Sequence, residues 1–261
     1  MKYILKACFL GVALSSTPAV AADLISAAAP DTAPAVESGW TYTVTPYLWA
    51  AGISGQTTQF NIPAVIDIDA DFGDILDNLD FAAMMIGEAR NGRFSLFGDL
   101  MYTNLSAGKA TPLGLAANSV DVDTSSFAAL AGVGYSVLEG PAGHLDVVGG
   151  VRLWSVDTDI SFSGGLLDGR SFSDGATWVD GLFGLKGTYA FTPNFYAVGW
   201  GLVGAGGADV DWDVMGGIGY NFNETFSATL GYRALGVDYS NDGFLFDVVQ
   251  QGPIAGLTIR F

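Results

Sequence analysis

Apolar and polar residues alternate along the chain from Trp40 to Phe261, in segments separated by residues that favour turns. A period of two places apolar side chains on one face of a strand, and repeated segments of roughly ten residues are typical of transmembrane strands. The pattern predicts ten strands, with eight as the alternative, at residues 41–54, 80–90, 93–104, 122–137, 144–158, 176–191, 195–206, 211–222, 225–239 and 248–261.

The whole sequence lacks the roughly 18 consecutive apolar residues that a membrane-spanning helix needs. We therefore expect an all-β protein, a closed antiparallel transmembrane β-barrel, because a closed barrel satisfies every backbone hydrogen bond within the bilayer. In the last strand Leu257, Ile259 and Phe261 share the face expected to contact lipid, whereas Arg260 lies on the opposite face.

The connections between these strands alternate between tight and long. The tight ones lie at residues 91–92, 138–143, 192–194 and 223–224, and the others, at 55–79, 105–121, 159–175, 207–210 and 240–247, are mostly longer and acidic. Outer-membrane barrels have short periplasmic turns and longer extracellular loops. The pattern therefore predicts acidic extracellular loops, with both chain termini in the periplasm. Within the first of these loops, Asp74 to Phe81 is expected to form a short helix.

The amino-terminal residues have the layout of a secretory signal peptide. Lys2 and Lys6 precede an apolar run, and a small-residue segment ends at Ala22. We expect a signal peptide at 1–22, a flexible periplasmic segment at 23–39 that is rich in alanine and proline, and the barrel at 40–261. The single cysteine, Cys8, falls within this leader, so disulfides and thiolate sites are not expected in the exported protein.

Removal of the leader leaves eight basic and 27 acidic residues, a net charge of −19. A charge this negative argues against nucleic acid as a partner. The mean hydropathy is nevertheless positive, at +0.37, and the chain has 36 glycines. An acidic chain that is still this apolar suits a barrel that faces lipid and lipopolysaccharide in the outer membrane.

The carboxyl-terminal alternation of Leu257, Ile259 and Phe261 resembles the signal by which the outer-membrane assembly machinery recognises barrels. Other segments resemble a family of proteobacterial outer-membrane β-barrel proteins of small, porin-like type. They are Thr45–Ala50, Asp74–Phe81, Gly98–Thr103 and Tyr232–Leu235. The resemblance covers nearly all of the exported chain and implies the barrel fold and an outer-membrane location, but no activity, cofactor or functional residue.

Most strand charges fall on positions that alternate with the lipid-facing residues, and they should therefore point into the lumen. A charge on the lipid face at mid-bilayer costs about 2–4 kcal/mol. The expected lumen charge network comprises Glu88, Arg90, Asp99, Asp146, Arg152, Asp180, Lys186, Arg233 and Arg260. The network is either a salt-bridged plug, which we favour, or the lining of an ion path. Eight glycines expected on inward positions leave room for either, at Gly132, Gly134, Gly150, Gly199, Gly201, Gly217, Gly219 and Gly231.

Aspartates also recur two residues apart in the predicted loops and at strand ends. Such residues point the same way, so the clusters Asp67, Asp69, Asp71 and Asp209, Asp211, Asp213 are weak candidates for sharing a divalent cation. Phe72 stands where a calcium-binding EF-hand loop needs glycine. No metal site is therefore assigned from the sequence, and solubilisation of the loops explains these aspartates equally well.

Enzymatic activity is not expected, because the only histidine, His144, lies beside a predicted periplasmic turn. A serine nucleophile at the other end of the barrel would lack its usual base. The leading hypothesis is a structural or surface-interaction barrel in the outer membrane. The alternative is a small passive channel, which the acidic loops would make cation-preferring. A soluble ligand-binding barrel does not fit, since its charged residues would point outward.

Overall fold

The computed structural model describes residues 39–60, 64–110 and 118–261. The predicted signal peptide and residues 23–38 of the lead-in segment lie outside the described residues. Twelve strands form one antiparallel sheet. They are β1 (Trp40–Trp49), β2 (Gly52–Thr58), β3 (Ile66–Ala70), β4 (Leu79–Asn91), β5 (Phe94–Ala110), β6 (Ser119–Gly140), β7 (Gly143–Ser163), β8 (Ser171–Ala190), β9 (Phe195–Gly206), β10 (Val210–Asn221), β11 (Phe226–Asn241) and β12 (Phe244–Arg260).

The sheet closes because β1 pairs with β4 on one side and with β12 on the other. This confirms the predicted barrel of ten strands, and β2 and β3 are two further strands. The break at Ala50 and Ala51 divides the predicted first strand: β2 continues beside β12 where β1 ends, and β3 pairs with β2. The β1–β4 ladder ends at the pair of Pro46 and Met85, where proline has no N–H to donate.

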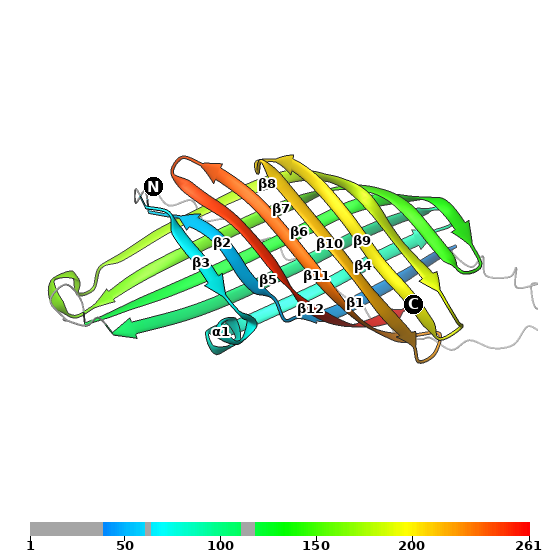
Figure 1. Ribbon diagram of the computed structural model, residues 1–261, viewed down its shortest axis with the longest axis horizontal. Coiled ribbons are helices and arrows are strands. Elements are labelled where there is room, and N and C mark those ends of the chain that lie inside the picture. The colour runs from blue at the N-terminus through cyan, green and yellow to red at the C-terminus, as the bar shows by residue number, and fades with distance from the viewer. Residues whose placement is uncertain (1–38, 61–63, 111–117) are drawn as a thin grey trace, which may run out of the picture. The chain divides into compact units, whose positions relative to one another are not determined.

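One end of the barrel carries the tight turns β4–β5, β6–β7, β8–β9 and β10–β11, and we call it the turn end. The opposite end, the hairpin end, carries the β7–β8 hairpin with a short 3-10 helix, η1 (Gly165–Leu167). In Figure 1 this hairpin and the carboxyl terminus lie at opposite ends of the barrel. The described residues contain no helix long and apolar enough to cross a membrane.

Strands β5 to β8 extend further toward the hairpin end than the sequence predicts. The β6–β7 ladder continues to the pair of Ser119 and Ser163, well inside segments expected to be loops. Aspartate, serine and glycine favour turns, and this preference masked the continuing alternation. The predicted helix exists but lies earlier, as α1 (Phe72–Asp77), because Asp71 and Asp74 form a capping box at its start.

The outer surface nearest the turn end is an apolar band. Val147, Val151, Phe183 and Leu230 are about half exposed or more on it. Aromatic pairs line its edge at the turn end, namely Trp40–Tyr42, Phe94–Tyr135, Tyr189–Phe191, Phe195–Tyr220 and Tyr220–Phe222. An apolar band bordered by aromatic residues is the surface that a bilayer requires of a barrel.

Between this band and the hairpin end, the alternation of apolar and polar side chains exchanges its two faces. Along β7 the outward positions change from Val147 and Val151 to Asp157 and Asp159, which are exposed. The inward positions change from buried Arg152 to Val156, which is 1% exposed. Because water rather than lipid surrounds the strands there, the polar side chains face outward and the apolar ones inward. The reversal therefore marks the edge of the membrane-spanning part that faces the hairpin end.

Candidate functional site

The centre of the lumen holds a buried ionic layer built on two arginines. The guanidinium of Arg152 contacts Asp211 at 2.5 Å and Asp213 at 2.6 Å. Arg233 donates to Asp213 and to Asp99, each at 2.7 Å. Both arginines are at most 1% exposed. Asp213 thus bridges the two guanidinium groups, and the layer joins strands β5, β7, β10 and β11 across the barrel.

Aromatic side chains complete this layer. The Tyr47 hydroxyl donates to Asp99 at 2.8 Å and accepts from Arg233 at 2.9 Å. The indole N–H groups of Trp154 and Trp200 donate to Asp211 and Asp213, at 3.0 and 2.9 Å. Buried charges are tolerated only when they are paired and their remaining lone pairs are hydrogen-bonded. The partners in this layer meet that condition.

An apolar and aromatic core fills the lumen between the ionic layer and the hairpin end. Trp178 stacks on Tyr239 with ring centroids 4.0 Å apart and on Trp154 at 5.9 Å. Phe246 and Val248 pack into the same buried cluster. Protein interiors of this kind pack about as densely as organic crystals. The layer and this core together occupy the middle and the hairpin-end part of the lumen with buried side chains.

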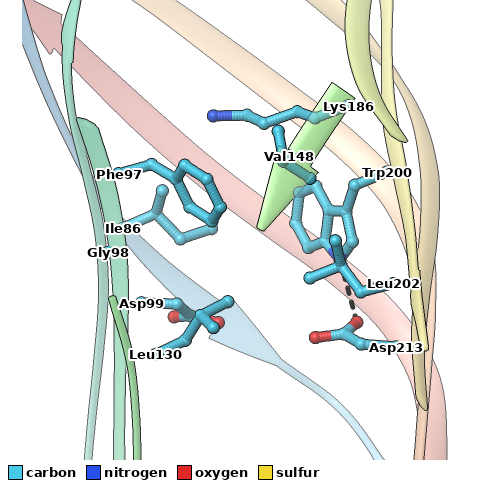
Figure 2. Close-up of a pocket in the computed structure, with 10 residues that line it drawn as sticks. All are labelled: Ile86, Phe97, Gly98, Asp99, Leu130, Val148, Lys186, Trp200, Leu202 and Asp213. Atoms are coloured by element: carbon cyan, nitrogen blue, oxygen red, sulfur yellow. Dashed lines mark hydrogen bonds between the residues drawn. The ribbon is translucent and has the colours of Figure 1, made fainter. Parts of the chain in front are cut away.

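Toward the turn end a cavity of about 30 Å³ follows the ionic layer. Figure 2 shows Asp99 on β5 and Asp213 on β10 facing each other across it. Beyond it a larger cavity of about 530 Å³ reaches the turn end, and Ile86, Lys186 and Trp200 line both spaces.

A second group of charges lines the wall beside this larger cavity. Arg90 pairs with Asp146 and, at 3.0 Å, with Glu88, and the same Glu88 also pairs with Lys186. The His144 ring lies 3.7 Å from Asp146. Ligand atoms of Glu88, His144 and Asp146 come within 4.8 Å of one another. Arg90 and Lys186 already neutralise both carboxylates, so the arrangement disfavours a divalent cation.

The structure brings together most, but not all, of the charges expected in the lumen. Asp180 is fully buried without a basic partner among the described residues and accepts from the Trp178 indole at 3.0 Å and the Ala208 N–H at 2.8 Å. Arg260 is exposed at the turn end and donates to the Glu224 carbonyl at 2.9 Å. These two residues therefore lie outside the ionic layer.

Sequence reasoning left Asp211 and Asp213 out of the lumen charge network, although they hold both arginines of the layer. The alternation along β10 could have identified them as inward, because Val214 on the same strand points outward and successive residues point to opposite faces. In the Asp209–Asp213 segment the arginines occupy two of the three carboxylates, which disfavours the shared cation expected there. The inward assignment of Gly199 and Gly201 is wrong, because Trp200 between them points into the lumen.

The other aspartates expected in loops have separate local contacts. Asp67 accepts from the Gln56 amide at 3.0 Å, and Asp71 caps α1. Asp69 is paired across the β2–β3 ladder with Ser54. At the hairpin end, burial raises the pKa of Asp238, and nearby Asp247 and Asp209 raise it further. Cation binding at Asp67, Asp69 and Asp71 remains a prediction.

Several solved structures are similar to this one. The outer membrane protease OmpT of Escherichia coli has a TM-score of 0.50 at 12% sequence identity, over 85% of this chain and 97% of OmpT. Ail, the attachment invasion locus protein of Yersinia pestis, is 15% identical with a TM-score of 0.37, over 85% of this chain and 99% of Ail. Neisserial surface protein A is 13% identical with a TM-score of 0.34, over 86% and 98%. No protein-family model and no curated protein sequence matches the chain.

Proposed function

We propose that the protein is an integral outer-membrane β-barrel with a closed lumen, acting as a structural or surface-interaction protein. The ionic layer carries this proposal. Arg152, Arg233, Asp211 and Asp213 are 0–1% exposed, and together with Asp99 they join four strands of the barrel. A conducting barrel needs a continuous hydrated path, and fully buried side chains occupy the middle of that path.

The strand extensions at the hairpin end supply the surface for interaction. Asp123 and Asp159 are paired across the β6–β7 ladder on its outer face, and both are exposed. Ser106 donates to Asp123 at 2.5 Å, and Ser173 also donates to Asp159. Outer-membrane barrels point their longer connections outside the cell. In that orientation this acidic face stands just above the lipid, and the tight turns lie in the periplasm.

A small cation-preferring channel is the second candidate, and the turn-end cavity favours it. A space of about 530 Å³ already opens the turn end of the lumen to water. The carboxylates of the ionic layer also outnumber its arginines. Conduction would require the layer itself to part, and the conductance of the purified protein separates the two candidates.

An enzymatic role has little support from the arrangement of titratable groups. The single histidine, His144, lies at the turn end beside Asp146 and near Arg90. No serine hydroxyl bonds to it among the described residues, and its ring contact is the Thr188 hydroxyl at 3.3 Å. We propose that His144 is a structural residue of the cavity wall, and that the protein has no catalytic function.

The proposed orientation can be tested by cysteine labelling on whole cells. Cys8 is the only native cysteine and lies in the predicted leader. Ser171→Cys adds a thiol at the hairpin end, and Glu224→Cys adds one at the turn end; both positions are exposed. A membrane-impermeant maleimide should label Ser171→Cys on intact cells and Glu224→Cys only after the outer membrane is permeabilised. Labelling of Glu224→Cys alone on intact cells would reverse the orientation.

A further inference from the structure

The cavity at the turn end has the properties of a small-molecule site that a closed barrel does not need. Its volume of about 530 Å³ falls within the range of roughly 300–1,000 Å³ typical of ligand pockets. Trp200, Met215 and Ile254 provide apolar lining, while Glu88, Arg90 and Lys186 provide charged groups. Ligand sites commonly combine apolar walls with a few converging polar groups in this way.

The charged side chains here differ from those of the ionic layer because the cavity leaves them accessible. The side chains of Lys186, Glu88 and Arg90 are 13%, 17% and 21% exposed, whereas those of Arg152 and Arg233 are at most 1% exposed. Groups that serve only to hold the barrel closed gain from complete burial and pairing. These side chains retain exposed surface that a ligand can contact.

Hydroxyl groups from several strands also line the cavity. Tyr196 contacts Ser227 at 3.2 Å and Thr229 at 3.1 Å, and Thr45 contacts Thr258 at 2.8 Å. Thr41, Thr43 and Thr188 line the same cavity. A hydroxyl has one donor hydrogen and two acceptor lone pairs, so each keeps capacity after these contacts. Such a wall suits a ligand that itself carries hydroxyl groups.

The charge of the lining is opposite to that of the molecule as a whole. Arg90, Lys186 and Arg260 are the cations of the lining. Arg90 and Lys186 are paired with Glu88 and Asp146, and Glu139 is paired with Arg93, so Arg260 is the lining cation that has no carboxylate partner among the described residues. The full chain has a net charge of −17. A cavity with one surplus positive charge in so acidic a protein favours an anion. We propose that it binds a small, singly charged carboxylic acid bearing several hydroxyl groups, of which a soluble sugar acid is the type.

Lys186 is the best-placed group to receive the carboxylate. Its ammonium has three donor hydrogens, and among the described residues the side chain hydrogen-bonds only to Glu88. Figure 2 shows the side chain reaching from β8 toward Phe97, whose ring centroid lies 5.2 Å from the ammonium. The Phe97 ring and Glu88 hold the ammonium in place, and its remaining donor hydrogens are available for a bound carboxylate.

Calorimetric titration of the purified full-length protein in detergent tests this site. Glucuronate should bind saturably, whereas glucose, which lacks the carboxylate, and acetate, which lacks the hydroxyls, should each bind about tenfold more weakly or less. Lys186→Gln should weaken glucuronate binding by about tenfold or more, as expected from the loss of a charge-assisted hydrogen bond. Thr229→Val, nearly the same shape, should also weaken it.

Arg93→Gln is the matched control, because Arg93 is a half-exposed cation at the same end of the barrel but outside the cavity lining. This variant should bind glucuronate as the native protein does. Absence of saturable binding, equal binding of glucose and glucuronate, or native affinity in both Lys186→Gln and Thr229→Val would overturn the proposal. None of these outcomes bears on whether the lumen conducts, so the proposed function is tested separately.

Discussion

Arg233 contacts several side chains of the lumen at once. Its guanidinium contacts Asp99, Asp213 and the Tyr47 hydroxyl, and lies 5.1 Å from the Trp49 ring centroid. The gain from such a pair against its desolvation is small, but removing one partner alone is costly because the other charge stays buried. The stability of the barrel should therefore depend strongly on this residue.

Arg233→Met should lower the free energy of unfolding by about 3–5 kcal/mol, the usual cost of breaking a buried ion pair from one side. The temperature at which the folded band converts to the unfolded band in detergent gels measures the change. Arg170→Met, an exposed position at the hairpin end, is the control and should leave that temperature nearly unchanged. Equal behaviour of the two variants would show that the ionic layer does not stabilise the barrel.

At the residue scale, the sequence predicted which charges point inward better than which charges meet. Alternation places Arg152 and Arg233 opposite the lipid face, and the structure has them there. The alternation does not determine where each residue lies along the barrel axis, because that position depends on the shear between strands. The sequence therefore placed Asp211 at a strand end and outside the lumen network, although it contacts Arg152, 59 residues away in the chain.

At the scale of elements, the strands were easier to predict within the membrane than above it. Inside the bilayer an apolar face alternates with a charged one, and this contrast is strong in β7 and β8. Above the bilayer, as in Val120 to Asp123, the contrast persists with its faces exchanged. Residues typical of turns occupy the outer face there, so the sequence alone suggested loops.

The end of the last strand, β12, is expected to be important for assembly of the barrel. Phe261 is 71% exposed, and its backbone N–H donates to the Tyr42 carbonyl at 2.9 Å while its carbonyl accepts from the Tyr42 N–H at 3.3 Å. Deleting Phe261 removes the terminal aromatic residue and two of the hydrogen bonds that join the end of the chain to β1.

We expect the truncated chain to reach the outer membrane in smaller amounts and to accumulate as periplasmic aggregate or fragments. Membrane fractionation followed by immunoblotting measures the distribution. Phe222→Leu is a suitable control, because it changes an exposed aromatic residue at the turn end without touching the terminal strand. Normal insertion of the truncated chain would show that Phe261 is not part of an assembly signal.

At the scale of the whole molecule, the proposed function depends on a lumen that is closed to solutes. The aromatic core, the ionic layer and the 30 Å³ cavity lie in series between the hairpin end and the larger cavity. A solute could cross the barrel only by displacing the side chains of the core and of the ionic layer. The barrel should therefore be stable and impermeable, and a single substitution in the layer should affect its stability before its permeability.

The most direct test measures the conductance of the refolded native protein and of Arg152→Ala in planar lipid bilayers, together with their unfolding temperatures. A plugged barrel predicts no sustained channel conductance from either protein and a clearly lower unfolding temperature for Arg152→Ala, because Asp211 loses its guanidinium partner. Steady native conductance, with a changed ion preference and an unaltered unfolding temperature in Arg152→Ala, would contradict the closed lumen and establish a water-filled channel.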